Sequence, residues 1–460
     1  SQKDMRDGWP ETKIWLNQIA SPEWTSYRLL VVGFAVLIAV GTLLLALPVA
    51  SATEDSLSFV DALFTATSAV SVTGLTVADT GTQFSIFGEV VILFLVQIGG
   101  LGIMTGTTLI ALLLKKRIQF KERLIIQRSF NLSSSAGIVR LVIYIIKVTL
   151  VIELIGAIIL TLLFFEEYGG IQSIYMGIWH SISSFCNAGF DVFGTNNSYQ
   201  NYLGHYAIYG VVGFLMLLGG IGFPVMNDVW QNRRWYSLQA QTKLVLTVTG
   251  CLIFLGTTML FLLEHNNPHT LGQLPFVDQL IVSFFQSLSS GTSGVTSLDI
   301  GELKPATLFF MTIFMFIGSA PGSTGGGIRT STFGIAVAAV WALIVGKEDV
   351  AVFYRRVSAS VVYRAFIVIF VSLGLVILLT GILTVIEPFP FLELFFEVIS
   401  AFSTVGLSTG ITSLLSSEGK VLLVVAMFIG RIGTLTLILS LMLRRRRGKY
   451  QYLKGKFRIG

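Results

Sequence analysis

Four short segments of the chain place a glycine among small side chains, in a pattern that could coordinate a dehydrated cation. They read AVSVTGLT (69–76), SFCNAGFD (184–191), SSGTSGVT (289–296) and AFSTVGLS (401–408). Glycine adopts backbone conformations that turn successive carbonyl oxygens toward one axis, and such oxygens can replace the water shell of an ion. Asp191 is the one acidic residue in these segments. Coordination without a ring of carboxylates favours a monovalent ion over Ca²⁺.

The segments therefore predict an ion-selective filter built from the shared glycines and the residues just before them. An alternative reading is that each glycine only makes a tight turn in a loop packed by helices, but four glycines at one repeated position favour the filter. The predicted filter residues are Val72, Thr73, Gly74, Asn187, Ala188, Gly189, Thr292, Ser293, Gly294, Thr404, Val405 and Gly406.

A short helix is predicted before each glycine, too short to cross a membrane. Ten positions before the glycines stand aromatic residues, namely Phe64, Trp179, Phe284 and Phe396. The carboxyl end of each helix would direct the negative end of its dipole toward the ion. Such re-entrant elements are tolerated in a membrane only where protein or a water-filled cavity covers them. The predicted short helices are 59–71, 174–186, 277–290 and 391–403.

Long apolar runs surround these short helices. The chain of 460 residues is 53% hydrophobic and 12% charged, whereas soluble domains carry about 25% charged residues. A helix crosses a hydrocarbon core of about 30 Å with roughly 20 apolar residues, and the chain contains eight such runs. We predict an all-α polytopic membrane protein with eight full spans at 29–49, 84–114, 137–165, 204–228, 240–263, 305–345, 361–386 and 417–443.

Charge orients the predicted spans. Lys and Arg residues cluster after the second, fourth and sixth spans and in the tail that begins at Arg444, whereas the other connections are acidic. By the positive-inside rule, both termini are cytoplasmic. The net charge of +6 reflects this division, so it does not indicate nucleic-acid binding.

The spans and short helices recur as one unit of about 110 residues. Each unit reads span, short helix, loop, span, and all four have the same orientation because each contains two full spans. Four parallel units can surround one central pore, whereas secondary transporters usually contain inverted repeats. The predicted division is an N-terminal cytoplasmic or interfacial segment 1–28, repeats at 29–131, 132–236, 237–350 and 351–443, and a basic cytoplasmic tail 444–460.

Glycine and proline interrupt the sixth span. The stretch GSAPGSTGGGIRTST (318–332) includes Gly318, Pro321, Gly322, Gly325, Gly326 and Gly327. Each glycine costs a helix about 1 kcal/mol and proline about 3 kcal/mol, so no continuous helix is expected here. A kink for helix packing is the alternative to a functional break.

Arg431 is a charge within the eighth span, at the place that Gly100 and Gly220 hold in the first two repeats. Charges at membrane depth are costly and usually functional. The alternative is a packing arginine paired with a carbonyl or with Glu153.

These residues resemble the Ktr/Trk/HKT superfamily of K⁺ transporters, and within it the KtrB-type membrane subunits. The resemblance covers about 29–443 and depends on the four degenerate filter segments. It implies that K⁺ is transported and bound at the filter residues, with Na⁺ as a candidate activator and no cofactor in this chain. It also implies that the loop at Gly318–Gly327 is an intramembrane gate and that Arg431 is an electrostatic barrier restraining it.

The resemblance further implies a homodimer in the plasma membrane and a separate cytoplasmic nucleotide-binding regulatory ring like KtrA. Relatives that prefer Na⁺ replace the first filter glycine with serine, so Gly74 indicates K⁺. The alternative function is a secondary cotransporter coupling K⁺ to Na⁺ or H⁺. A membrane scaffold does not explain the repeated loops, and no residue pattern indicates an enzyme.

Overall fold

The computed structural model describes residues 22–53, 57–102, 138–194, 198–347 and 349–434. The predicted N-terminal segment, the basic stretch after the second span and the basic tail lie mostly or wholly outside these residues. Within them the chain is mostly helical, and strands occur only as a small antiparallel hairpin of β1 (Ala351–Val352) and β2 (Arg355–Arg356).

The helices fall into four successive groups, each a longer helix, a short helix and a further helix. Group 1 is α2 (Pro22–Leu45), α3 (Phe59–Ser71) and α5 (Ile86–Leu101). Group 2 is α8 (Ile138–Tyr168), α9 (Gly170–Cys186) and α10 (Tyr206–Ile221). Group 3 is α12 (Ala240–Glu264), α13 (Phe276–Thr292) and α14 (Pro305–Phe316). Group 4 is α16 (Ala359–Ile386), α17 (Phe391–Ser403) and α18 (Ser417–Ile432).

Three further helices lie outside this pattern, one within group 1 between its short helix and its last helix, and two between successive groups. They are α4 (Thr80–Gln83), α11 (Phe223–Asn232) and α15 (Thr330–Ile344). Single 3₁₀ turns lie at Pro48–Ala50, Ser198–Tyr202, Trp235–Ser237, Ile300–Glu302 and Thr412–Leu414.

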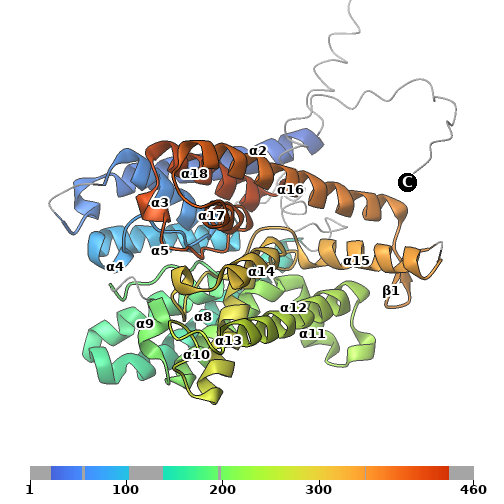
Figure 1. Cartoon of the computed structure of the whole chain (residues 1–460), viewed down its shortest axis with the longest axis horizontal. Coiled ribbons are helices and arrows are strands. Elements are labelled where there is room, and N and C mark those ends of the chain that lie inside the picture. The colour runs from blue at the N-terminus through green and yellow to red at the C-terminus, as the bar shows by residue number, and fades with distance from the viewer. Residues whose placement is uncertain (1–21, 54–56, 103–137, 195–197, 348, 435–460) are drawn as a thin grey trace, which may run out of the picture.

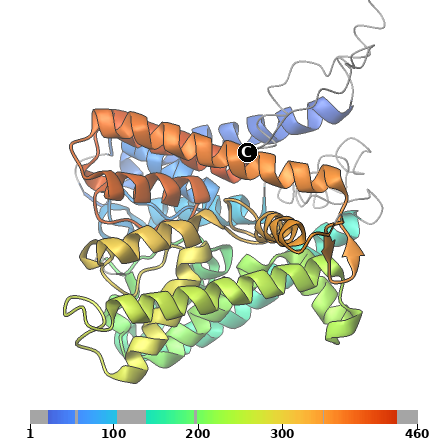
Figure 2. The same cartoon turned by 45° about the vertical axis from the view of Figure 1, so that its right-hand side comes forward.

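The last helix of each group packs against the short helix of the next. The contacting pairs are α5 with α9, α10 with α13, α14 with α17, and α18 with α3. The final pair joins group 4 to group 1, as Figure 1 shows for α18 and α3. This contact closes the four groups into a ring. Figure 2 shows the long helices α16 and α12 on opposite sides of this arrangement.

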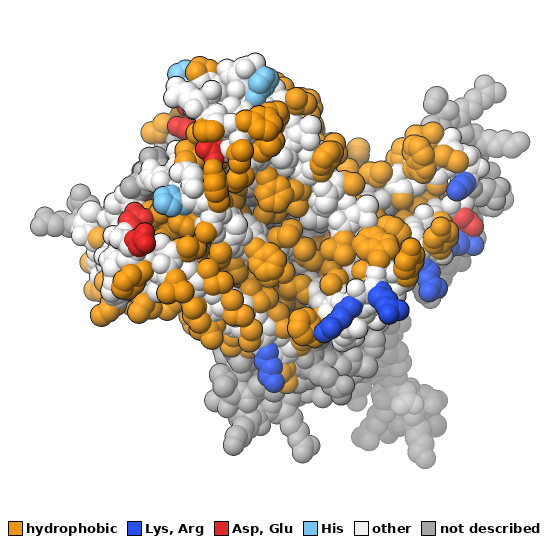
Figure 3. All heavy atoms as spheres, turned by 90° about the horizontal axis from the view of Figure 1, so that it is seen from below, with side chains coloured by type: hydrophobic (Ala, Val, Ile, Leu, Met, Phe, Trp, Pro, Cys, Tyr) orange, Lys and Arg blue, Asp and Glu red, His pale blue; other side chains and the backbone are white. Residues whose placement is uncertain are grey.

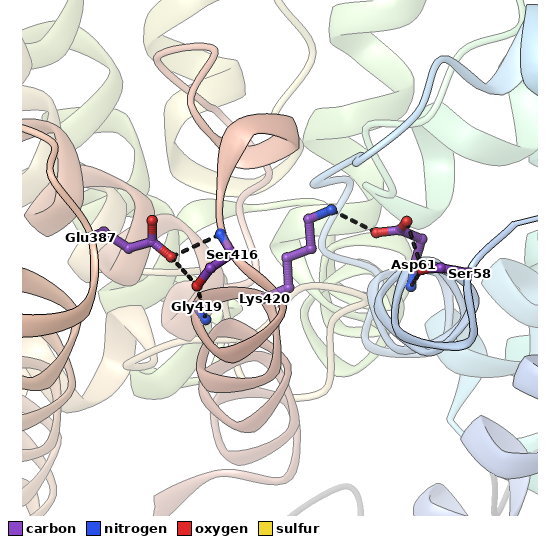
Figure 4. Close-up of polar contacts among 6 residues, drawn as sticks. All are labelled: Ser58, Asp61, Glu387, Ser416, Gly419 and Lys420. Atoms are coloured by element: carbon purple, nitrogen blue, oxygen red, sulfur yellow. Dashed lines mark hydrogen bonds and ion pairs between the residues drawn. The ribbon is translucent and has the colours of Figure 1, made fainter.

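An ion pair contributes to the contact that closes the ring. Lys420 Nζ of α18 lies 2.7 Å from Asp61 Oδ1 of α3, and both side chains are largely buried, at 14% and 27% exposed. Ser58 caps α3 by accepting from the Asp61 amide, while Glu387 accepts from the Ser416 amide at 2.8 Å and so holds the start of α18 (Figure 4).

Three of the described helices, α8, α12 and α16, are long and apolar enough to cross a membrane, or four spans if the bent pair α10–α11 counts as one. The run 204–228 is not the single straight helix that a continuous span would require, because α10 ends at Ile221 and α11 turns away by 97°. Gly222 at φ +94° and Pro224 in the first turn of α11 make this bend. The prediction of eight full spans stays a prediction.

The surface agrees with a membrane setting. The face in Figure 3 carries a broad apolar area, with Lys and Arg side chains mostly toward one end and most Asp and Glu side chains toward the other. Large aliphatic and aromatic side chains are exposed along α8 and α16, among them Leu162 at 69% and Phe370 at 79%. Lipid is the medium that such a surface suits.

The aromatic residues aligned in the short helices pack into the core, with one exception. Phe64, Trp179 and Phe396 are at most 1% exposed, but Phe284 is 49% exposed, and Phe285 at 2% takes the buried position instead. Phe284 differs from the other three because α13 continues one residue closer to its glycine than the other short helices do, through Thr292.

Candidate functional site

The four filter glycines form a ring. All four have positive φ: Gly74 +87°, Gly189 +72°, Gly294 +69° and Gly406 +97°. A Cβ built on Gly74 would lie 2.9 Å from Gly189 Cα, and one on Gly294 would lie 2.7 Å from Gly406 Cα. One on Gly189 would lie 3.6 Å from the Gly294 carbonyl carbon, and one on Gly406 would lie 3.1 Å from that of Gly74. The chain thus brings the four predicted segments together around a common centre.

No larger residue fits these glycine positions, because the atoms that it would meet are backbone atoms of the neighbouring filter segment. The nearest is a carbonyl oxygen in each case, and the four belong to Ala188, Ser293, Val405 and Thr73. These four are the residues immediately before the glycines. The ring therefore places one carbonyl oxygen from each segment beside the glycine of its neighbour.

Three of the short helices end in a left-handed residue two positions before the glycine, namely Val72 (φ +58°), Asn187 (+59°) and Thr404 (+52°). A left-handed conformation is a genuine outlier for a β-branched residue such as Val72 or Thr404. Backbone hydrogen bonds hold it in place, for example Thr73 N to Ser68 O at 2.8 Å and Val405 N to Ser400 O at 2.9 Å. Strain of this kind persists where the surroundings over-determine it and is frequent at functional sites.

Serine side chains brace each filter segment, and the sequence reasoning did not identify them. Ser68 Oγ accepts from Gly74 N, and Ser400 Oγ accepts from Gly406 N, both at 3.1 Å. Ser183 Oγ donates to Phe190 O at 2.5 Å, and Ser289 Oγ donates to Val295 O at 2.6 Å. Three of these serines stand six positions before a glycine, a repeated signal that could have been read.

Oxygen atoms at the inner end of the filter lack protein partners. Asn187 Oδ1, Ser293 Oγ and Thr404 Oγ1 are buried and have no hydrogen-bond partner within the described part of the chain. Buried polar groups are normally satisfied. A dehydrated monovalent cation is a chemically suitable partner for such oxygens.

A polar cavity of about 370 Å³ opens on the outer side of the ring. The four glycines line it together with Asp79, Asp191, Asp299 and several hydroxyl side chains. Burial raises the pKa of Asp191, which lies in the loop beyond the filter and outside the spans, to about 6. An acidic mouth raises the local concentration of cations.

A loop at 318–327 lies against the inner side of the ring, between α14 and α15. Its two ends are joined by a parallel bridge between Ile317 and Ile328. Asn187 Nδ2 donates to Thr324 Oγ1 at 2.9 Å, Gly326 lies against the Thr404 side chain, and Gly327 lies against Ser403. The loop therefore touches the inner ends of α9 and α17.

The other predicted loop residues fix its path. Ala320 N and Thr324 N donate to Gly220 O and Gly219 O of α10, at 3.0 and 3.2 Å. Gly318 packs on the Gly326 backbone and Gly325 on Ser319. Gly322 O accepts from Phe223 N at 3.1 Å, and Pro321 O approaches Gly222.

Arg431 ties this loop to α5. Its guanidinium donates to Thr324 O and Gly99 O, and it lies 3.4 Å from Gly100 O. The partners of Arg431 are therefore backbone carbonyl groups, one of the two partners expected if this arginine serves only for packing. The other kind, Glu153, instead accepts from Gln97 Nε2 at 3.1 Å.

Arg329, to which the sequence assigned no role, also holds the loop. Its NH1 donates to Gly325 O at 2.6 Å and reaches Ala320 O at 3.4 Å. Two partly buried guanidinium groups thus bind carbonyl oxygens of one short loop. Sequence spacing gave no means to identify these partners, because hydrogen bonds to the backbone leave no residue signature.

Three of the helices that follow the filter segments end at equivalent glycines with the same backbone conformation. Gly102, Gly222 and Gly433 follow α5, α10 and α18, with φ between +84° and +94° and ψ between 133° and 141°. The sequence analysis predicted a break only in the sixth span. The last glycine of three similar segments, QIGGLG (97–102), LGGIG (218–222) and IGRIG (429–433), is the signal for the other three helix ends.

Comparison with known proteins agrees with this arrangement. Residues 18–451 match the family model described as "TrkH: Cation transport protein". The chain is 42% identical to the Ktr system potassium uptake protein B of Bacillus subtilis, over 91% of this chain and 93% of that protein. It is 38% identical to the potassium/sodium uptake protein NtpJ of Enterococcus hirae, over 94% and 97%.

The fold is also that of a solved structure. The potassium transporter TrkH of Vibrio parahaemolyticus superposes with a TM-score of 0.72, covering 90% of this chain and 84% of that chain at 18% identity. The matching family and the apolar helices mark a protein embedded in a membrane. The chain belongs to the TrkH family of cation transport proteins, and among its relatives are the Ktr system potassium uptake proteins.

Proposed function

We propose that this chain is a channel-like K⁺ uptake subunit that conducts K⁺ down its electrochemical gradient through one central pore. The observation that carries the proposal is the ring of four glycines, in which each segment contributes a carbonyl oxygen beside its neighbour's glycine. Four parallel repeats with eight full spans would surround this ring. Carbonyl oxygens in such a ring replace the hydration shell of the passing ion.

K⁺ is the proposed ion for two reasons. Relatives at 42% and 38% identity are named for uptake of potassium and of potassium or sodium. Gly74, which is serine in Na⁺-preferring members of the superfamily that this sequence resembles, is glycine here. Na⁺ remains a candidate activator.

The loop at 318–327 is the proposed gate. It lies directly inside the filter and is held by Arg431, Arg329 and Asn187. Opening requires these hydrogen bonds to break and the loop to leave the inner ends of the short helices. Hydrogen bonds to charged groups contribute about 1.5–3 kcal/mol each, which is enough to favour a closed loop and small enough for a regulator to overcome.

We further propose that the protein acts in the plasma membrane as a homodimer with both termini cytoplasmic. A separate cytoplasmic nucleotide-binding ring would regulate the gate. The name of the Bacillus subtilis relative, a protein of a Ktr system, supports a transporter with separate partners. The cytoplasmic placement of the termini follows from the positive-inside rule.

Cotransport of K⁺ with Na⁺ or H⁺ is the second candidate, and one observation favours it. Glu153 on α8 is a carboxylic acid only 6% exposed, at membrane depth. Its oxygens accept from Gln97 at 3.1 Å and face the Cys186 thiol at 3.8 Å. Intramembrane acids of this kind are frequent in ion-coupled transporters.

Ion-replacement flux in a cell that lacks its own K⁺ uptake tests the proposal. A channel-like subunit should carry Rb⁺ or K⁺ inward with no Na⁺ gradient and no pH gradient, at a rate that follows the membrane potential. Uptake that vanishes without one of these gradients would assign the chain to cotransport. A Gly189→Trp variant, which blocks the ring, is the negative control.

A further inference from the structure

Each short helix buries one polar residue on the face that carries its bracing serine. This residue directly follows the buried aromatic residue of the helix and stands three positions before the serine. Residues three apart lie on the same face of a helix, so the residue and the serine face the same filter segment. The four residues, all at most 2% exposed, are Thr65, His180, Gln286 and Glu397.

Glu397 holds the outer end of the fourth filter segment. Its Oε1 accepts from Ser408 Oγ at 2.5 Å and from Thr409 N at 3.0 Å, and its Oε2 accepts from Thr412 Oγ1 at 2.7 Å. Ser408 and Thr412 line the outer cavity together with the filter glycines. Glu397 is fully buried and makes no ion pair within the described part of the chain. Its carboxyl group therefore joins α17 to the loop that follows Gly406.

Gln286 makes the equivalent contact in the third segment with a neutral side chain. Its Oε1 accepts from Ser297 N and from Ser297 Oγ, both at 3.1 Å. Thr296 and Leu298, on either side of Ser297, line the outer cavity. The Gln286 Nε2 atom has no hydrogen-bond partner among the described residues. An acceptor oxygen, rather than a charge or an amide donor, is thus what Gln286 and Glu397 have in common.

The equivalent residue of the second group contacts its segment in another way. His180 stacks on Phe193, which follows Gly189, with ring centroids 4.1 Å apart, and its Nδ1 lies 2.8 Å from Met176 O of its own helix. Among the four equivalent residues, those with printed hydrogen bonds to the outer edge of the filter are therefore Gln286 and Glu397.

We infer that Gln286 and Glu397 are positioning residues that set the preference of the filter for K⁺ over Na⁺. The bracing serines hold each segment close to its glycine, and these two acceptors hold the third and fourth segments at their outer edge. Buried donors that lose their acceptor move toward another partner, so a segment without this contact can shift. A ring that can shift is free to contract around the smaller Na⁺ ion. The inference rests on the proposed function of the ring as a K⁺ filter.

The ratio of Rb⁺ uptake to Na⁺ uptake in a K⁺-uptake-deficient cell, at matched expression, tests the inference. Glu397→Ala leaves three donors of the loop without their acceptor, and the ratio should fall about tenfold. Glu397→Gln keeps an acceptor oxygen, so its ratio should stay within about twofold of wild type. An equal loss in Glu397→Gln would overturn the inference, because it would assign the effect to the charge.

Glu264→Ala is the matched control for a general loss of stability. Glu264 is also fully buried, and it accepts from Lys304 N at 3.0 Å and from Thr270 Oγ1 at 2.7 Å. It is not among the residues that line the outer cavity. Glu264→Ala should lower the temperature of thermal unfolding and leave the uptake ratio unchanged. The same loss of ratio as in Glu397→Ala would overturn the inference.

Gln286→Ala is an independent test that removes no charge. Its uptake ratio should also fall, and an unchanged ratio would overturn the inference even if Glu397→Ala does not reach the membrane. Wild type tests the proposed function in the same assay. A wild type without preference for Rb⁺ over Na⁺ would refute the K⁺ filter and this inference together, whereas a selective wild type with an equally selective Glu397→Ala would refute this inference alone.

Discussion

The substitution Gly74→Ser tests the carbonyl ring most directly. Gly74 has φ +87°, and a Cβ there would collide with the Ala188 carbonyl oxygen and lie 2.9 Å from Gly189 Cα. Both are backbone atoms of the adjacent filter segment, so neither can rotate away as a flexible side chain would. The added atom must therefore displace one of the four carbonyl oxygens of the ring.

The expected loss of K⁺ selectivity follows from two energetic costs, backbone strain and overpacking. A left-handed conformation costs a residue with a Cβ about 1–2 kcal/mol, and overpacking a close-packed site costs about 1–3 kcal/mol. If half of the resulting 2–5 kcal/mol appears as weaker coordination of K⁺ relative to Na⁺, the uptake ratio falls roughly 5- to 60-fold, because 1.4 kcal/mol corresponds to tenfold.

Paired Rb⁺ and Na⁺ uptake in a K⁺-uptake-deficient cell measures this ratio at matched expression. Gly410→Ser is the control, because Gly410 has φ +96° but a Cβ added there would meet no atom within 4 Å. The Gly410→Ser variant has the cost of the left-handed conformation without the collision. Its ratio of Rb⁺ uptake to Na⁺ uptake should therefore equal that of wild type. An unchanged ratio in Gly74→Ser would refute the carbonyl ring, and an equal loss in Gly410→Ser would attribute the effect to strain alone.

Four other perturbations have expected outcomes. Arg431→Ala removes two charge-assisted hydrogen bonds to carbonyls, about 1.5–3 kcal/mol each, so flux should rise at least tenfold, and a fall at normal expression would indicate a structural role. Deletion of 322–327 should leave a conducting and less regulated pore, and an inactive pore would contradict the gate. A double-mutant cycle on Lys420→Ala and Asp61→Ala should give a coupling of about 1 kcal/mol in thermal unfolding, and zero coupling would show that the ion pair does not close the ring. Because Asp191 has its pKa raised to about 6, its charge is present above pH 6 and lost below it, so uptake at pH 5 should be lower than at pH 7.5, and Asp191→Asn should remove that dependence.

Local signals predicted the short helices well. The bounds of α3 and α17 agree with the predicted 59–71 and 391–403, because Ser58 and Pro390 mark their starts and small residues followed by glycine mark their ends. These start and stop signals depend on only a few neighbouring residues, so they can be recognised in a single sequence. The meeting of the four loops could be inferred as well, since equivalent units in one orientation surround a common axis.

Long-range contacts account for what the sequence did not predict. The end of α13 is one residue later than in the other short helices, and Thr292 at that end packs against Gly220 of α10. This contact joins segments far apart in the chain, so counting back from Gly294 selected Phe284 instead of the buried Phe285. The carbonyl partners of Arg329 and Arg431 are equally invisible in sequence, because every residue offers a carbonyl.

The departures from fourfold equivalence explain why one chain rather than four identical copies forms this ring of glycines. Arg431 occupies the position of Gly100 and Gly220, and a Cβ at those glycines would lie 2.8 Å from Cys186 Sγ and 2.9 Å from Thr292 Cγ2. A side chain at this position in the first two groups would therefore require Cys186 or Thr292 to move. Four arginines around one axis would also repel one another, by about 4 kcal/mol for each pair 4 Å apart at an effective dielectric constant of 20. A single polypeptide can keep the carbonyl ring fourfold while it places one cation and one loop beneath it, and carbonyl oxygens from α5 and from the loop itself are sufficient to hold that single charge.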